Sequence, residues 1–279
     1  MSFRSIIVHN HLFKNAGSTI DWALEKNFGK GFVDHRDDIH MRQGTVYLGN
    51  YLEHHPHIKA LSTHHLALPL PSLPKTHLLQ MVMFRHPIER AISVYWFEKK
   101  QDASISRGAF QAQNHVLPEY IAWRMQPDVG PVIRDFQTRR TLQVNGCAKG
   151  NPTSQFTEEA RHLVGTIELP GLVDRFDESM VLFEETLTEM FPKIDLSYVI
   201  QNTNQERTES TELRLQRLEL EIGGEIYRML VDNNLRDLQL LEIVKDEFEL
   251  RVSRVPDFSQ KLLNFRKRCV ARSIEYHGH

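Results

Sequence analysis

The sequence predicts an α/β fold in three layers, with a parallel β-sheet flanked by helices. Short apolar runs alternate with amphipathic segments along the first half of the chain. Polar loops follow the ends of these runs, and the run at 78–84 is apolar almost throughout, as expected of a strand buried on both faces. Strands that alternate with helices form parallel sheets, and ligands bind there at the carboxyl ends of the strands.

The first unit of this pattern is a strand, a loop and a helix. Residues 5–8 form an apolar run that predicts a buried strand. Residues 19–26 predict a helix, because Ile20, Ala23 and Leu24 recur at helical spacing. The intervening loop is polar and contains a single lysine, Lys14.

Two further strands are predicted before residue 90. Residues 27–57 are rich in Gly, His and Asp and predict a loop, with a candidate short strand at 46–48. A second strand at 58–63 leads into the pair His64 and His65 and then into the segment "ALPLPSLPK", whose prolines exclude a helix. The strand at 78–84 ends at Arg85, and a helix is predicted over 88–100.

The remainder of the chain predicts mainly helices. Residues 101–165 are interpreted as a helical insert, with helical pieces at 117–125, 131–142 and 157–164. A strand at 171–175 and a helix at 177–190 follow, and long amphipathic helices are predicted at 211–233 and 235–252. No internal repeat divides the sequence. We therefore expect one domain over 1–279, with the helices of 211–252 packed on the sheet.

Composition limits the function classes. Because 34 Lys and Arg balance 36 Asp and Glu, general binding to nucleic acid or to an anionic membrane is disfavoured. The two cysteines, Cys147 and Cys269, match no metal-ligand spacing and predict free thiols in a reducing compartment. No apolar stretch long enough for a signal peptide or a transmembrane segment precedes His9, which predicts a cytoplasmic protein.

The loop after the first strand predicts an anion site. It lacks the glycines of a Walker loop, and its lysine comes first. Small residues let main-chain N–H groups approach an anion, and hydroxyls at the start of a helix add donors. The loop therefore suits one phosphate group. The alternative is an ordinary turn in which Ser18 is the N-cap of the helix.

The segment "FRHPIERAISVYWF" at 84–97 predicts a second anion site. Arg85 ends a strand, and Ser93 lies two turns into the following helix. An arginine fork and a hydroxyl on one helix face could share a further phosphate. The alternative makes Arg85 a surface ion-pair residue and Ser93 a packing residue.

These segments resemble those of the carbohydrate sulfotransferases related to heparan and chondroitin 2-O-sulfotransferases. "LFKNAGSTI" resembles the family's I-P-K-[TN]-[AG]-G-[ST]-[ST], with Phe13 in place of proline, and 84–97 resembles R-[DH]-P-[IV]-E-R-x-x-S-x-[YF]. A third stretch, 169–187, is similar to G-[LV]-[TV]-E-R-[FY]-[DE]-[ED]-S, with Arg175 and Ser179 at matching positions. The resemblance implies a sheet akin to that of nucleotide kinases.

The resemblance also implies the donor and its site. The donor would be 3'-phosphoadenylyl sulfate, and the product adenosine 3',5'-bisphosphate, without a metal. Arg85 and Ser93 would bind the 3'-phosphate. The 5'-phosphosulfate would be bound by the lysine loop, which consists of Lys14, Asn15, Ala16, Gly17, Ser18 and Thr19.

Two catalytic roles follow. Lys14 would stabilise the leaving phosphate, where negative charge develops. The stretch "ALSTHHLAL" resembles the family's [LI]-S-G-H, which places His64 as the general base, with His65 as the reserve because a one-residue shift exchanges them. The chain holds 15 histidines, so a solvated or chance pair is the alternative. A zinc site at 54–65 is disfavoured, because no cysteine or carboxylate there completes a tetrahedral set.

The family expectation for the acceptor is a hydroxyl of a glycan or glycolipid. The insert at 101–165 is expected on the acceptor side, and the absence of an anchor suggests a soluble bacterial-type member of the family. Two rival hypotheses remain: a magnesium-dependent nucleotide phosphotransferase, and a non-catalytic nucleotide-binding protein.

Overall fold

The computed structural model describes residues 3–66, 68–142, 151–199 and 209–277. The chain divides into two compact units. The sheet unit consists of Met1–Phe84, Arg161–Thr203 and Ile243–His279, and the helical unit of Arg85–Ala160 and Asn204–Glu242. The single domain expected over 1–279 stays a prediction, and the cysteine at position 147 lies outside the described residues.

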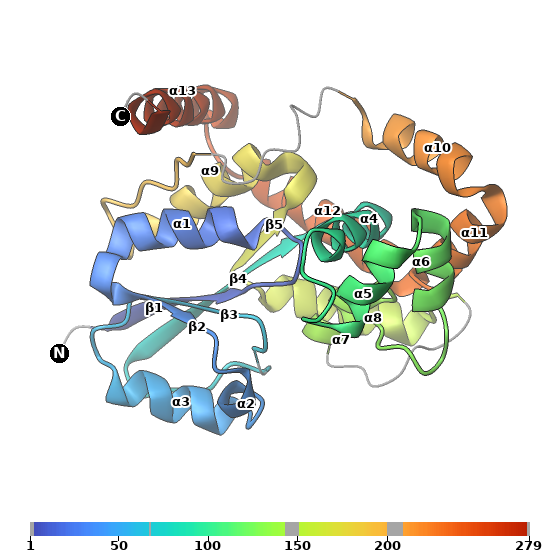
Figure 1. The fold of residues 1–279 in the computed structure, drawn as a ribbon. Coiled ribbons are helices and arrows are strands. Elements are labelled where there is room, and N and C mark those ends of the chain that lie inside the picture. Colours follow the sequence, from blue (N-terminus) through green and yellow to red (C-terminus); the bar gives the residue numbers. More distant parts are fainter. Residues whose placement is uncertain (1–2, 67, 143–150, 200–208, 278–279) are drawn as a thin grey trace. The chain divides into compact units, whose positions relative to one another are not determined.

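The sheet unit contains five parallel strands in the order β2-β3-β1-β4-β5 (Figure 1). β1 lies in the middle and pairs with β3 on one side and β4 on the other. This arrangement confirms the parallel α/β fold predicted from the sequence. The strands are β1 (Arg4–Asn10), β2 (Phe32–His35), β3 (Ala60–Thr63), β4 (Thr76–Phe84) and β5 (Leu169–Leu172).

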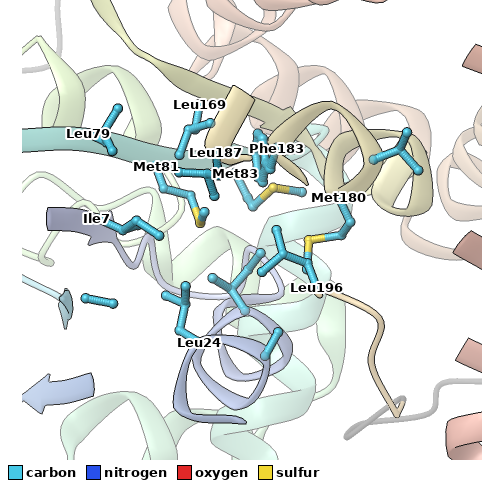
Figure 2. Packing of buried hydrophobic residues seen from close by; sticks show 14 of the residues in the cluster. Ile7, Leu24, Leu79, Met81, Met83, Leu169, Met180, Phe183, Leu187 and Leu196 are labelled. Atoms are coloured by element: carbon cyan, nitrogen blue, oxygen red, sulfur yellow. The ribbon is translucent and has the colours of Figure 1, made fainter. Parts of the chain in front are cut away.

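Helices cover both faces of this sheet and make it the middle of three layers. Alternate residues of a strand point to opposite faces. Ile7 therefore packs with α1 (Gly17–Phe28), α9 (Phe176–Leu187) and α13 (Phe258–His277). Ile6 and Val8 pack with α2 (Asp38–Met41) and α3 (Thr45–His54). Figure 2 shows the first of these two cores, in which Leu79, Met81 and Met83 of β4 meet the side chains of α1 and α9.

The segment predicted as a loop between the first two strands is mostly regular. It contains the four-residue strand β2 and the helices α2 and α3. The candidate strand at 46–48 was wrong, because these residues lie in α3, where Leu48 and Leu52 are spaced one helical turn apart and are both buried. The proline-rich segment after β3 contains no helix in its described residues, as expected, and Leu66, Leu68, Leu70 and Leu73 pack on the α3 side of the sheet.

Two other elements end at residues that differ from those predicted from the sequence. The last strand ends at Leu172 rather than continuing to residue 175, and Val173–Arg175 form a short 3-10 turn. The helix predicted over 211–233 is divided at Gly223, whose φ of 82° lies in the left-handed region. The result is α10 (Thr211–Ile222) and α11 (Gly224–Asp232).

The helical unit contains residues 101–160 of the segment interpreted as a helical insert over 101–165, and the role of that segment as an insert stays a prediction. The helices of the unit are α4 (Pro87–Lys99), α5 (Arg107–Asn114), α6 (Leu117–Arg124), α7 (Phe136–Thr141), α10 and α11, together with the beginnings of α8 (Ser154–Thr166) and α12 (Leu235–Val252). Two buried carboxylates cap two of these helices reciprocally. Asp237 accepts from the N–H groups of Gln137 (3.0 Å) and Thr138 (2.7 Å), and Asp135 accepts from those of Arg236 and Asp237 (3.1 Å each).

None of the helices in the described part of the chain combines the length and apolar character needed to cross a bilayer.

Gly171 provides a test of the packing between β5 and α9. A Cβ at this position would lie 2.5 Å from Sδ of Met83 and 2.7 Å from Cζ of Phe183. We therefore expect Gly171→Ala to lower the free energy of unfolding by about 1–3 kcal/mol in urea titrations, because the core cannot admit the methyl group.

The matched control is Gly165→Ala in α8, where a Cβ would meet nothing within 4 Å. This variant should unfold at the same urea concentration as the wild type or at a slightly higher one. Equal stability of the two variants would contradict the close approach of β5 and α9.

Candidate functional site

The loop after β1 has an unusual backbone. Lys14 (φ 66°) and Ala16 (φ 61°) both adopt the left-handed region, which residues with a Cβ rarely occupy. Ala16 is the N-cap of α1, and as an alanine it makes no side-chain capping hydrogen bond. Ser18 is the second residue of the helix, so it is not the N-cap. The N–H groups in the first turn of a helix have no partner within the helix, so an anion at this end of α1 could accept hydrogen bonds from them.

Asn15 anchors this loop to the sheet. Its side chain is 1% exposed, and its Nδ2 donates to the carbonyl oxygen of Met83 near the end of β4 (2.7 Å). The strand order reverses at β1, from which the chain proceeds first to β2 and β3 on one side and then to β4 and β5 on the other. Ligands of open α/β sheets bind at such a reversal. The Nδ2 group of Asn15 therefore helps to hold the loop in position, and the predicted contact of this residue with the donor stays a prediction.

A shared carboxylate joins β1 to α1. Asp21 accepts a hydrogen bond from Nδ1 of His9 at Oδ1 (2.8 Å) and from Nδ1 of His11 at Oδ2 (2.9 Å). Nη2 of Arg36 lies 3.3 Å from the same Oδ2, and Oγ of Ser62 lies 3.1 Å from Nδ1 of His9. His9 and His11 are both buried. We call His9, His11, Asp21 and His64 the histidine cluster.

The protonation states in this cluster follow from burial and charge. Burial lowers the pKa of His9, although Asp21 opposes the shift. Burial acts to raise the pKa of Asp21, but the charge of His9 and the hydrogen bonds from His11 and His9 outweigh it and hold that pKa well below its usual range. Asp21 is therefore an ionised acceptor. Because it cannot donate, the Nδ1 atoms of His9 and His11 must carry the protons.

Gly17 packs directly on the ring of His11. A Cβ on Gly17 would lie 2.1 Å from Cδ2, 2.1 Å from Nε2 and 2.5 Å from Cε1 of that ring. Such similar short distances to three ring atoms place the missing group over the ring face rather than at its edge. Only glycine lets the backbone at position 17 approach the ring of His11 this closely. The lysine loop therefore packs directly on the histidine cluster at this position.

The structure separates the two histidines that the sequence left as alternatives. The ring of His64 lies 4.3 Å from the ring of His11, at 58° to it. His65 points elsewhere, with Nε2 3.0 Å from Oδ2 of Asp38 in α2. His64 therefore belongs to the cluster beside the lysine loop and His65 does not. The role of either residue as a base stays a prediction.

The environment of His64 keeps its ring neutral. Burial, followed by the charges of His11 and Arg36, lowers the pKa of His64 to about 3. Its Nε2 is buried and has no hydrogen-bond partner among the described residues. An orphaned ring nitrogen of this kind favours the uncharged imidazole.

Arg85 and Ser93 belong to the helical unit. The main chain of Arg85 is fixed by the side chain of Gln137, whose Oε1 accepts from the Arg85 N–H (2.9 Å) and whose Nε2 donates to the Arg85 carbonyl (2.8 Å). Ser93 lies in α4, which begins at Pro87, as expected for this helix. Their predicted contacts with a 3'-phosphate stay predictions.

The matching residues of the third segment have structural contacts. Ser179 is fully buried, and its Oγ accepts from the N–H of Leu172 (2.9 Å) and lies 2.9 Å from the carbonyl oxygen of Arg175. The guanidinium of Arg175 pairs with Glu178 and Glu249. The contacts of Ser179 join the end of β5 to α9, and those of Arg175 reach α9 through Glu178 and α12 through Glu249, which accounts for both residues without a ligand.

His9, His11 and Asp21 were not among the site residues predicted from the sequence. The sequence did contain a pattern that could have identified them. Positions 7, 9 and 11 alternate along the strand, so His9 and His11 lie on the same face as Ile7, which packs on α1, the helix that carries Asp21. These three are also the one group in the described residues that could hold a metal ion, with one ligand atom each within 4.8 Å. The Nδ1 atoms of His9 and His11 lie 2.8 and 2.9 Å from the carboxylate oxygens of Asp21, which are hydrogen-bond distances. Arg36 also places a positive charge beside Asp21, so the contacts are those of a hydrogen-bonded cluster.

Comparisons with known proteins do not assign a function. No model of a protein family matches the chain. The chain is 29% identical over 251 residues to an uncharacterized protein of Archaeoglobus fulgidus, and the match spans 88% of this chain and 98% of that protein. The similarity thus extends over both units.

His64 provides a test of the electrostatics. Since its folded-state pKa is depressed, the unfolded chain takes up a proton first as the pH falls below about 6.5, and stability present above that pH is lost toward pH 3. When the pH is lowered from about 7 to about 5, the free energy of unfolding should fall by about 1 kcal/mol less in His64→Gln than in the wild type. This value is discounted for the partial solvent screening of His64.

The matched control is His162→Gln, which changes an exposed histidine of α8. Urea titrations at the two pH values should give this variant the same loss of stability as the wild type. The same loss in His64→Gln would show that His64 has an ordinary affinity for protons in the folded protein.

Proposed function

We propose that the protein is a sulfotransferase that transfers the sulfuryl group of 3'-phosphoadenylyl sulfate to a hydroxyl group of a carbohydrate or glycolipid. One observation carries the proposal. The N-cap of α1 is Ala16, whose side chain cannot cap the helix, and both Ala16 and Lys14 adopt the left-handed region. Strained main chain of this kind is concentrated at ligand sites, where several N–H groups converge on one anion.

The size of this anion site suits a single phosphosulfate. The loop has one lysine and one glycine, so it lacks the long glycine-rich backbone that holds consecutive phosphates in a Walker loop. It also resembles the lysine loop of the carbohydrate sulfotransferases. In that family this loop binds the 5'-phosphosulfate, and the residues matching Arg85 and Ser93 bind the 3'-phosphate.

The proposed reaction needs two further functions from the protein. The acceptor oxygen attacks sulfur while the bond between sulfur and the phosphate oxygen breaks, and negative charge accumulates on that oxygen. Lys14, at the start of the loop, is proposed to stabilise this charge. A histidine is proposed to take the proton of the acceptor hydroxyl, and the resemblance assigns this role to His64.

The histidine cluster supports this chemistry by its position. His64 follows β3, and its ring contacts the ring of His11, which in turn packs against Gly17 of the lysine loop. The proposed proton acceptor and the proposed anion site therefore adjoin each other within the sheet unit.

Ligand-dependent thermal unfolding tests the donor. We expect adenosine 3',5'-bisphosphate at about 100 times its dissociation constant to stabilise the protein by about 2.7 kcal/mol, a rise of roughly 5 °C in Tm. ATP with magnesium should give a smaller rise. Lys14→Ala should weaken bisphosphate binding about 10- to 100-fold, the value of a hydrogen bond to a charged group.

Lys30→Ala, which removes an exposed lysine of the same unit, is the control and should bind like the wild type. Stabilisation by ATP with magnesium but not by the bisphosphate would favour a phosphotransferase and would refute the sulfotransferase proposal. Bisphosphate binding without turnover of the donor would instead indicate a non-catalytic nucleotide-binding protein. An unchanged affinity in Arg85→Ala would remove Arg85 from the site.

A further inference from the structure

His11 is held in a defined orientation by three contacts. Its Nδ1 donates to Oδ2 of Asp21, its ring face is covered by Gly17, and its ring lies 4.3 Å from that of His64. Since the proton is on Nδ1, the lone pair is on Nε2. A carboxylate behind Nδ1 fixes the tautomer of an imidazole and stabilises the imidazolium that forms when Nε2 takes a proton.

Three titratable groups contact His11 directly, Asp21, His9 and His64, and the guanidinium of Arg36 contacts Asp21. Asp21 lies on α1, His9 on β1, Arg36 after β2 and His64 after β3. Asp21 is the only carboxylate hydrogen-bonded to a histidine of the cluster in the described residues, and it contacts His9 and His11 but not His64. The pairing expected of an assisted base is therefore found at His11.

His9 is less suited to the role. It shares Asp21, but it lies within β1, is 1% exposed and also contacts Ser62. His11 follows the end of β1, and its ring lies against Gly17 of the loop that is proposed to hold the sulfuryl donor. Of the two histidines joined to the carboxylate, His11 is the one in contact with the anion site.

We propose that His11 is the general base of the reaction and that Asp21 is its positioning residue. The inference rests on the proposed function and replaces His64 in the role that the family resemblance gives it. As the acceptor oxygen forms its bond to sulfur and the bond from sulfur to the phosphate oxygen breaks, Nε2 of His11 takes the acceptor's proton. The resulting imidazolium is paired with Asp21 and later releases the proton to solvent. His64 packs against the base and keeps its ring in place.

Turnover of 3'-phosphoadenylyl sulfate tests the inference, with release of adenosine 3',5'-bisphosphate measured by chromatography. Water and methyl glucoside serve as acceptors, because their weakly acidic hydroxyls depend on a base. We expect His11→Gln to lower kcat at least about 100-fold with bisphosphate binding retained, and His64→Gln to lower it less. His162→Gln, at an exposed position, should match the wild type.

Asp21 is tested by its effect on the pH profile. Asp21→Asn should lower kcat by about tenfold or more and shift the acidic limb of the profile to lower pH, since an imidazolium loses the carboxylate that stabilises it. Asp21→Glu should restore part of the rate. A residue that only stabilised the fold would change Tm without moving this limb.

The outcomes separate the inference from the proposed function. A wild-type protein that does not bind the bisphosphate refutes the proposed function, and the inference with it. Bisphosphate binding without turnover of the donor refutes the proposed catalytic function, and the inference with it. Turnover that is lost in His64→Gln and retained in His11→Gln overturns the inference alone. Stoichiometric zinc in the purified protein, absent from Asp21→Asn, would also overturn it, because His11 would then be a metal ligand.

Discussion

The burial of β1 on both faces is the constraint on which the sheet unit depends. Ile6, Ile7 and Val8 are completely buried between the two helical layers, and so is the strand's carboxyl end, where His9 is 1% and Asn10 2% exposed. Polar side chains in such a position must find partners inside the protein, because an unmade hydrogen bond there costs about 1–3 kcal/mol. The histidine cluster is the consequence of placing polar residues at the end of an apolar central strand.

Asp21 meets this requirement for two histidines at once. A buried carboxylate is costly unless it is paired and hydrogen-bonded, and here two ring N–H groups and Arg36 share its charge. The rigidity of this arrangement extends to the lysine loop, since Gly17 lies on the ring of His11 and Asn15 is bonded to β4. The strained residue Ala16 is thereby held between two fixed points, and Lys14 directly precedes the first of them, as expected of a preorganised ligand site.

The third segment illustrates how a motif can reflect packing. Gly171 and Ser179 lie where β5 meets α9, and a Cβ on Gly171 would lie 3.1 Å from Cβ of Ser179, so position 171 leaves no space for a larger residue. A segment that resembles one family in sequence can therefore serve the fold as well as ligand contacts. The distinction matters for Arg175, whose ion pairs with Glu178 and Glu249 already engage its guanidinium.

The local order of the sequence determined the fold class, because apolar runs that alternate with amphipathic helices can bury their surfaces only as a covered parallel sheet. It also located the lysine loop, since a polar loop between a strand and a helix falls at the carboxyl edge of such a sheet. The sequence did not resolve β2, whose four residues are too few for a clear period, or Ser18, which proved to lie inside α1. Only the tertiary structure decided which histidines meet Asp21. His11 and Asp21 are ten residues apart, His9 and Ser62 are fifty-three apart, and hydrogen bonds at 2.9 and 3.1 Å depend on strand register and helix packing that no local pattern contains.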